Sequence, residues 1–251
     1  MSGHSHWSKI KRGKAATDAK RGRVWSKLAR RIIVAAKSGG GNPDDNLTLR
    51  YAIDEARAVN MPNDTIDKAI KKGTGELGAE QYEQVVYEGY GPGGVAFLVD
   101  CLTDNRNRTV PDMRKMFERS GGQLGATNCV AWMFEKKGRF MVSAEAANED
   151  LLMEIALEAG ADDVQLDDDT FEIISDASAF ATVKQAIADR GIETISAELA
   201  MVPQTTVAVA ADKAKQVITL LEALEDHDDV QNVFANFDIP DEVVDELAQK
   251  D

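Results

Sequence analysis

The chain has little of several features that mark particular protein classes. Its 251 residues include only two cysteines, Cys101 and Cys129, without C-x-x-C spacing and each within an apolar segment. This usage suits buried thiols in a reducing compartment better than a disulfide framework. Apolar runs such as 32–36 reach only five residues, far short of the ~18 that a spanning helix needs. We therefore expect a globular protein that neither enters nor crosses a membrane.

Histidine is equally scarce, which limits the catalytic chemistry available. His4 and His6 lie near the N-terminus, and His227 lies within the acidic run 225–229, which we interpret as a solvated loop. None is close to a convincing nucleophile, and the acids at 167–169 lack the spacing of a calcium loop. We expect no enzyme, no cofactor, no small-molecule substrate and no metal site. An enzyme with a site between α/β domains is the alternative, but it would need clustered functional groups that the sequence does not offer.

Two features of the N-terminus leave alternatives open. If Met1 is removed, residues 2–4 place an amine, two amides and the His4 imidazole in an arrangement suited to square-planar Cu(II) or Ni(II). We do not expect this chelate to have a biological use. The Arg-rich, acid-poor start also shares its composition with organellar transit peptides.

Acidic residues are scarce only at one end of the chain. Residues 1–37, called the basic segment below, hold eleven Lys/Arg and one acid, Asp18, although the whole chain has a formal charge of −14. Residues 141–251 instead hold 5 basic and 27 acidic residues. A basic end on an acidic body favours contact with a polyanion, because clustered Lys/Arg release phosphate counterions on binding. A solvated, disordered tail is the simpler alternative.

Helical periodicity appears in three places before residue 78. Between Arg23 and Lys37, apolar residues recur on one side and basic residues on the other. Gly22 weakens any extension toward the N-terminus, and the glycines at 39–41 end the helix. Two more helices are predicted, over 45–59 and from an Asn63 cap to Gly73. Together they predict a small basic three-helix bundle.

After residue 78, strands alternate with helices. Residues 138–203 spell β-α-β-β-α-β, the order of a ferredoxin-like unit, and the flanking segments spell the same order. The predicted fold class is α+β, with an N-terminal three-helix bundle followed by two ferredoxin-like α/β domains, one inserted into the other. The predicted domains are 1–78, 79–136 with 204–240, and 137–203. The elements expected in the split domain are strand 95–102, helix 110–119, strands 129–134 and 206–210, helix 212–224, strand 230–237 and an extra strand over 81–88. The insertion is placed in the central hairpin connection of that domain.

Two motifs could bind phosphate. Residues 89–94 match the G-x-G-x-x-G dinucleotide fingerprint, but a strand follows where the fingerprint needs a helix N-terminus, so we interpret them as a tight turn. Arg106 and Arg108 flank the start of a helix with an expected Thr109 cap, where amides and guanidiniums could hold phosphate. A polar turn whose arginines pair with nearby acids is an equally good interpretation.

Several segments together resemble the YebC/PmpR family of probable transcriptional regulatory proteins, which also includes the mitochondrial translational activator of cytochrome c oxidase subunit I. The matching segments are 3–7, 14–22, 35–37 with the glycines that follow, 69–73, 87–94 and 104–109. The resemblance spans nearly the whole chain and implies a three-domain cytoplasmic protein without known catalysis that works on nucleic acid. It begins at residue 3, which disfavours the organellar member and favours a bacterial cytoplasmic one.

The expected function is therefore that of a non-enzymatic, nucleic-acid-binding regulator of gene expression, namely a DNA-binding transcriptional regulator. The alternative is a ribosome-associated translation factor that aids synthesis of proline-rich or otherwise stalled stretches, with the basic segment on ribosomal RNA. Residues expected to contact the nucleic-acid backbone are Lys9, Lys11, Arg12, Lys14, Lys20, Arg21, Arg23, Lys27, Arg30 and Arg31, with Arg106 and Arg108 as secondary candidates. Because phosphate contacts carry no sequence information, these residues do not choose between DNA and the ribosome.

Overall fold

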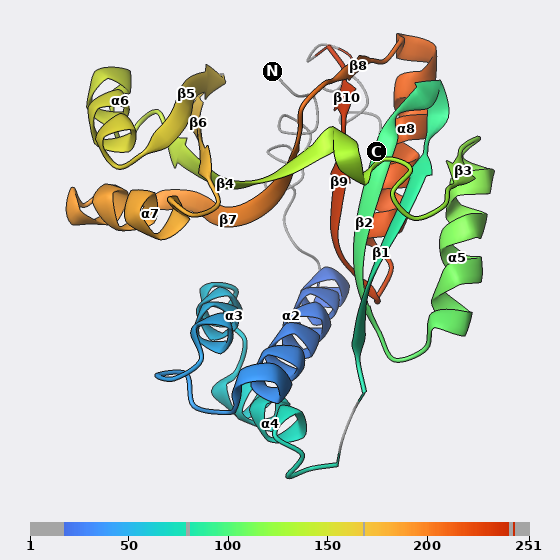
Figure 1. Ribbon diagram of the computed structural model, residues 1–251, viewed down its shortest axis with the longest axis horizontal. Helices are drawn as coiled ribbons and strands as arrows, with labels where there is room; N and C mark the ends of the chain where they lie inside the picture. The colour runs from blue at the N-terminus through green and yellow to red at the C-terminus, as the bar shows by residue number, and fades with distance from the viewer. Residues whose placement is uncertain (1–17, 79–80, 168, 241–242, 244–251) are drawn as a thin grey trace.

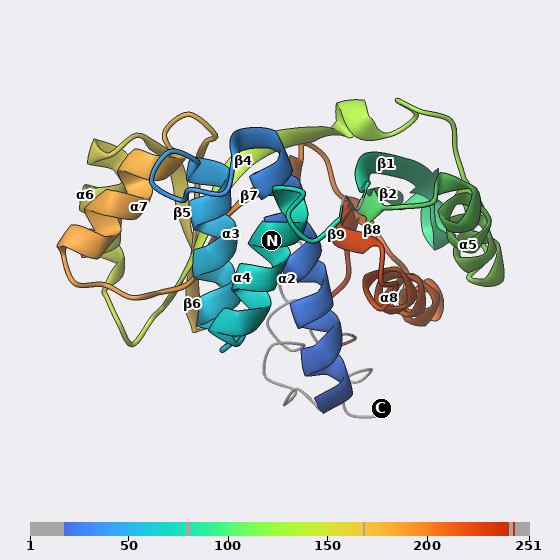
Figure 2. The ribbon, with the colours of Figure 1, turned by 90° about the horizontal axis from the view of Figure 1, so that it is seen from below.

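Three helices form the N-terminal part of the fold. The computed structural model describes residues 18–78, 81–167, 169–240 and 243, with side chains from residue 21 onward. Helices α2 (Asp18–Gly39), α3 (Leu47–Ala58) and α4 (Asn63–Gly73) lie side by side, as Figure 2 shows. Their apolar faces share one core in which Ile32 and Leu49 are fully buried. The predicted N-terminal helical bundle is confirmed.

Two details of these helices differ from the prediction. Helix α2 begins at Asp18 rather than Arg23 and continues through Gly22, because one glycine costs a helix only about 1 kcal/mol relative to alanine. Asn63 does not cap α4. The cap residue is Pro62, whose carbonyl accepts the N–H groups of Thr65 and Ile66 at 2.9 and 3.2 Å.

The first sheet has four antiparallel strands in the order β3-β1-β2-β9. They are β1 (Glu83–Tyr90), β2 (Ala96–Thr103), β3 (Gln123–Leu124) and β9 (Val230–Ala235). Helices α5 (Arg106–Arg119) and α8 (Ala211–Glu225) pack on one face of this sheet and share a core with it (Figure 1). The turn between β1 and β2 contains the short 3₁₀ helix η1 (Pro92–Gly94) and closes with a bond from Gly91 N–H to the Val95 carbonyl, 2.8 Å. The prediction of a tight turn at 89–94 is confirmed.

Two predicted strands of this domain are wrong. The segment 206–210 contributes only β8 (Val207–Ala208), which pairs in parallel with β10 (Phe237–Asp238) outside the four-stranded sheet. As the third strand of a ferredoxin-like unit, this segment was expected at the centre of the sheet beside β2. That place is taken by β1, which the tight turn holds in register with β2 along its whole length. The supposed extra strand is therefore a central one.

The segment 129–134 is not a strand either. Residues Ala131–Met133 form a short 3₁₀ helix, η2, and the next strand begins at Phe134. The buried Glu88 carboxylate accepts the N–H groups of Asn128, Val130 and Ala131. These amides are therefore not available to a strand ladder.

The second sheet has the order β5-β6-β4-β7 with antiparallel neighbours throughout. Its elements follow the ferredoxin-like sequence β4 (Phe134–Ser143), α6 (Glu149–Glu158), β5 (Ala161–Asp167), β6 (Thr170–Asp176), α7 (Phe180–Asp189) and β7 (Thr194–Pro203). Phe140 stacks on Phe180 at a centroid distance of 5.0 Å in the core beneath α6 and α7. The predicted α+β class with two α/β units is confirmed.

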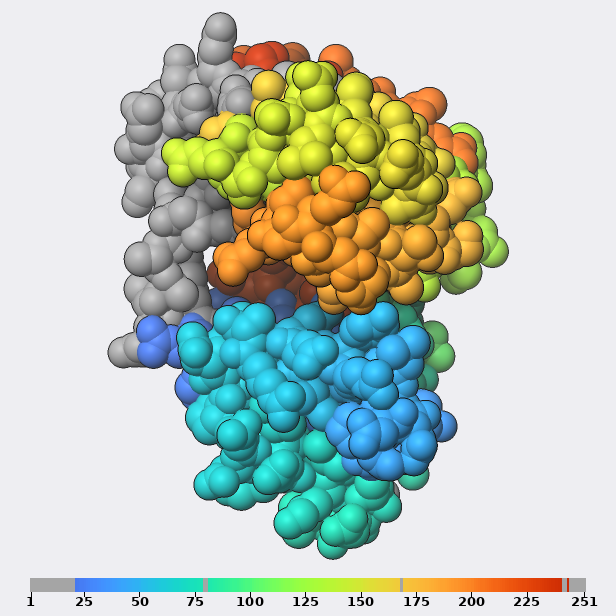
Figure 3. All heavy atoms as spheres, turned by 90° about the vertical axis from the view of Figure 1, so that its left-hand side faces the viewer, coloured from blue at the N-terminus to red at the C-terminus, as the bar shows by residue number. Residues whose placement is uncertain are grey.

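The three units touch one another. Phe134, at the start of β4, packs with Ala96 and Leu98 of β2 in a small separate core. In Figure 3, α7 (orange) lies above α3 (light blue), where the Lys184 ammonium is 5.2 Å from the Tyr51 ring centroid. The domain boundaries 1–78, 79–136 with 204–240, and 137–203 remain a proposal, supported by the three main cores.

Candidate nucleic-acid interface

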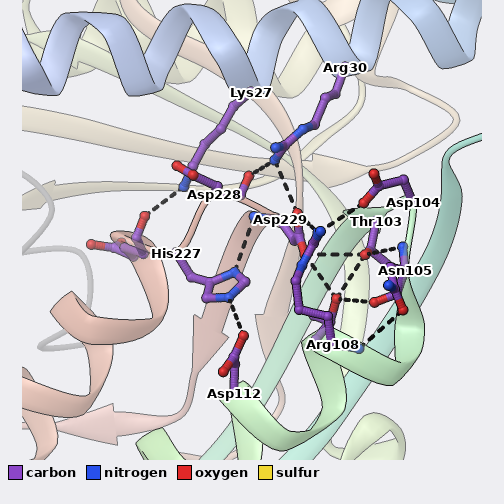
Figure 4. Close-up of polar contacts among 12 residues, drawn as sticks. Lys27, Arg30, Thr103, Asp104, Asn105, Arg108, Asp112, His227, Asp228 and Asp229 are labelled. Atoms are coloured by element: carbon purple, nitrogen blue, oxygen red, sulfur yellow. Dashed lines mark hydrogen bonds and ion pairs between the residues drawn. The ribbon is translucent and has the colours of Figure 1, made fainter. Parts of the chain in front are cut away.

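The basic side of α2 faces the loop that joins α8 to β9 (Figure 4). Lys27 Nζ donates to the Glu225 carbonyl at 2.6 Å, and Arg30 donates to the Asp228 carbonyl. One helical turn before Lys27, the Arg23 guanidinium lies 3.1 Å from the Asp226 carboxylate.

Arg31 extends the same contact. It donates to the side-chain oxygens of Gln231 at 3.1 Å and Asn232 at 2.9 Å, and it pairs with Glu55 of α3 at 2.8 Å. The basic side chains of α2 that were predicted to bind phosphate therefore already donate hydrogen bonds to oxygen atoms of the same chain.

Asp229 is the centre of this contact. Asp229 is 1% exposed. Its carboxylate accepts hydrogen bonds from Arg108 at 2.9 and 3.2 Å, from the Thr109 hydroxyl at 2.9 Å and from the Thr103 hydroxyl at 3.2 Å. Arg30 of α2 lies 3.4 Å from the same carboxylate. A single buried acid thus joins α2, the end of β2 and the first turn of α5.

The charges around Asp229 set its protonation. Burial alone would raise the pKa of this carboxyl, but the hydrogen bonds from Arg108 and Thr109, together with the positive charges of Arg108 and Arg30, lower it below the usual value. Hydrogen bonding to Asp229 is also the main cause that raises the pKa of Arg108. Both groups are charged at neutral pH, and the Arg30 guanidinium, 3.4 Å from Asp229, connects this pair to the N-terminal helices.

His227 belongs to the same loop. Its Nδ1 accepts the N–H of Asp229 at 3.1 Å, and its Nε2 lies 3.6 Å from the Asp112 carboxylate of α5. The interpretation of 225–229 as a solvated loop is therefore wrong for its last residue, because Asp229 has four partners that replace water. One feature of the sequence could have indicated that Asp229 is buried: it directly precedes Val230, the first residue of strand β9 (Val230–Ala235).

The start of α5 differs from the predicted phosphate site in its cap. Asn105 is the cap residue, with its side-chain oxygen accepting the Arg108 N–H at 3.2 Å. Thr109 lies inside the helix and is fully buried. Arg108 pairs with Asp104 and Asp229, both at 2.9 Å, and Arg106 lies 3.6 Å from Glu83. These are the pairs that the polar-turn interpretation predicted, and phosphate binding by Arg106 and Arg108 stays a prediction.

The remaining candidate contacts lie toward the N-terminus. Arg21 is exposed near the start of α2. Lys9, Lys11, Arg12 and Lys14 lie outside the described residues, as do His4 and the side chain of Lys20. The structure therefore brings Arg23, Lys27, Arg30, Arg31 and Arg108 together around one loop and does not test the others.

Two further observations bear on other functions. Between residues 18 and 240, leaving out the gaps at 79–80 and 168, no group of three or more His, Cys, Asp or Glu side chains is arranged to hold a metal ion. Over the same part of the chain, none of the helices combines the length and the apolar character required to span a bilayer.

Comparison with known proteins gives a consistent family. Residues 5–76 match the model of the TACO1/YebC protein N-terminal domain, and residues 82–237 match the model of the TACO1/YebC second and third domain.

Two bacterial relatives, each named a probable transcriptional regulatory protein, match over their whole length. The protein from Syntrophobacter fumaroxidans is 55% identical over 99% of this chain, and that from Geobacter sulfurreducens is 52% identical over 98%. A crystal structure of a conserved hypothetical protein from Aquifex aeolicus is also similar, with a TM-score of 0.83 and 47% identity, covering 90% of this chain and 94% of that one.

Proposed function

Because the chain belongs to the TACO1/YebC family, we propose that it is a non-enzymatic, nucleic-acid-binding regulator of gene expression, namely a DNA-binding transcriptional regulator in the cytoplasm. The observation that carries this proposal is the basic segment, with eleven Lys/Arg and one acid in a chain of net charge −14. Such a segment binds phosphates in preference to other partners, while the acidic end of the chain is repelled by them. The names of the relatives support the regulatory role.

Four of the candidate contacts already have partners in the structure. Arg23, Lys27, Arg30 and Arg31 are already bound to oxygens of the α8–β9 loop and of α3. A phosphate that used them would have to replace partners held in fixed geometry. Because residues 1–17 contain no acidic residue, we assign most of the binding free energy to Lys9, Lys11, Arg12 and Lys14, and give Arg106 and Arg108 a secondary part.

The experiment compares two variants that lose the same charge. In the first, Lys9, Lys11, Arg12 and Lys14 become Gln. In the second, the matched control, four exposed lysines outside the basic segment become Gln: Lys68, Lys115, Lys213 and Lys215. Affinity for a random-sequence DNA duplex is measured from 50 to 200 mM salt. Removing one phosphate contact to a duplex should flatten the salt slope by about 0.9, so the slope of the first variant should fall by up to about 4 and that of the control far less. Equal slopes in the two variants would contradict the assignment to the basic segment.

A translation factor acting on the ribosome is the second candidate, and one observation favours it. The basic side of the amphipathic helix α2 is turned toward the α8–β9 loop, so it is not presented as a recognition helix for a DNA groove. A ribosome would offer phosphates to the basic segment and basic proteins to the acidic residues 141–251.

Sedimentation with ribosomes distinguishes the two candidates. Binding through six to ten phosphate contacts to random DNA should weaken by about 10³–10⁵ between 50 and 200 mM salt. Ribosome association that persists at 150–200 mM, with no DNA site bound selectively at that salt, would favour the second candidate. A DNA site bound tightly and selectively, with no ribosome association, would favour the first.

A further inference from the structure

Two exposed aromatic side chains stand together on the surface near the loop that leads from β3 to β4. Trp132 in η2 is 67% exposed, and Tyr90 at the end of β1 is 38% exposed. Trp132 Nε1 and Tyr90 Oη both donate to the carbonyl of Cys129, at 3.2 and 3.1 Å. The shared acceptor places the two side chains next to each other. It also uses their polar hydrogens, so that the rings offer mainly apolar surface.

The backbone beneath Trp132 is held firmly. Glu88 is 4% exposed, and its carboxylate accepts the N–H groups of Asn128 at 2.6 Å and of Val130 and Ala131 at 2.8 Å. The Glu88 carbonyl accepts the N–H of Gly125 at 2.7 Å. Three charge-assisted hydrogen bonds to one buried carboxylate fix the loop before any partner arrives, so little conformational freedom remains to be lost on binding.

The surroundings of the two rings favour a small flat ligand over a protein surface. The loop residues 126–128 are exposed, and two of them, Thr127 and Asn128, are polar. On this side, polar residues border the rings, whereas a protein docking site is expected to be a broad apolar patch.

We propose that Tyr90 and Trp132 form a stacking platform for unpaired nucleobases. Aromatic side chains bind bases of any identity through the base π-face, provided that the bases are not already stacked in a duplex. The preferred ligand is therefore single-stranded nucleic acid. This platform rests on the proposed nucleic-acid function and adds to it a second surface, distinct from the basic segment.

The test measures two quantities with a 12-nucleotide single-stranded oligouridine RNA and a DNA duplex. The first is the affinity of the full chain and of Trp132→Ala. Loss of one stacked base should weaken oligouridine binding roughly ten- to hundredfold and leave duplex binding unchanged. Trp132→Phe should restore most of the affinity. Leu157→Ala, which truncates another exposed apolar side chain at 52% exposure, is the control and should have no effect.

The second quantity is the fluorescence of Trp132 in the full chain carrying Trp7→Phe and Trp25→Phe. Oligouridine should quench it, and the duplex should not. Thermal melting of Trp132→Ala should match the parent chain because the ring is mostly exposed. Oligouridine binding that is not weakened by Trp132→Ala and does not quench the fluorescence of Trp132 would show that the platform is wrong, while the proposed function would stand. If neither nucleic acid binds, the proposed function itself fails.

Discussion

Replacing Asp229 with Asn is the sharpest perturbation of the contact between α2 and the α/β domain. Asn keeps the shape of the side chain but removes the charge opposite Arg108 and Arg30, and it offers one oxygen where the carboxylate offers two. The hydroxyls of Thr103 and Thr109 both bind Oδ2, so an Asn that keeps these bonds would place its NH₂ group at the Oδ1 position, facing the guanidiniums of Arg30 and Arg108.

The expected cost follows from these contacts. Removing one partner of a buried ion pair costs about 3–5 kcal/mol, and each hydrogen bond to a charged group contributes about 1.5–3 kcal/mol. The Arg108 side chain is 49% exposed and can regain water, which reduces the cost. We expect Asp229→Asn to lower the free energy of unfolding by about 2–3 kcal/mol, measured by urea denaturation at pH 7.

The neighbouring acid supplies the control. Asp228 is exposed, and its hydrogen bond with Arg30 of α2 involves its main-chain carbonyl rather than its carboxylate. Asp228→Asn should therefore change the stability by less than about 0.5 kcal/mol. Equal stability of the two variants would refute the reasoning that Asp229 joins the two parts of the chain.

Three further outcomes are expected. A Cβ at Gly73 would lie 2.5 Å from the Ile33 carbonyl oxygen, so Gly73→Ala should destabilise the protein by about 1–3 kcal/mol. A Cβ at Gly22, inside α2, would meet no other atom, so Gly22→Ala should stabilise the protein by about 0.5–1 kcal/mol. Thermal melting of the two variants and the parent chain tests both expectations. Folding lowers the pKa of Asp229, so the stabilisation of the fold by its charge is complete above the unfolded pKa of about 3.9 and is lost as pH falls toward the folded pKa. The difference in free energy of unfolding between the parent chain and Asp229→Asn, measured by urea titration, should therefore narrow between pH 6 and pH 3. Burial, aided by the charges of Asp100 and Asp229, raises the pKa of the Cys101 thiol to about 12. Because the thiolate is the form that reacts, iodoacetamide at pH 8 should alkylate Cys129 faster than Cys101, as measured by peptide mass spectrometry.

Features set by local sequence were predictable. The separation of apolar and basic residues along α2 predicted both the helix and its two sides, and the order of elements in 138–203 predicted the second sheet. Each of these signals lies within one element or between neighbouring elements. The apolar pattern alone is enough to decide which side of such an element is buried.

Features set by distant contacts were not predictable. Glu225 and Asn232, which bind Lys27 and Arg31, lie 198 and 201 residues further along the chain, and no local sequence pattern predicts these contacts. Glu88 prevents a strand at 129–134 from a position about forty residues earlier. In the same way, β1 takes the central place that local order assigned to 206–210. The sequence thus identified the basic side of α2 but not the acidic loop that occupies it.

The central claim is that the basic segment contacts nucleic acid in the cell. Ultraviolet cross-linking in growing cells, followed by purification and peptide mass spectrometry, tests it directly. The proposal predicts nucleotide adducts on peptides from residues 1–37, with DNA as the attached nucleic acid; ribosomal RNA on the same peptides would favour the translation factor instead. Adducts confined to other parts of the chain, or none above an untreated control, would contradict the claim.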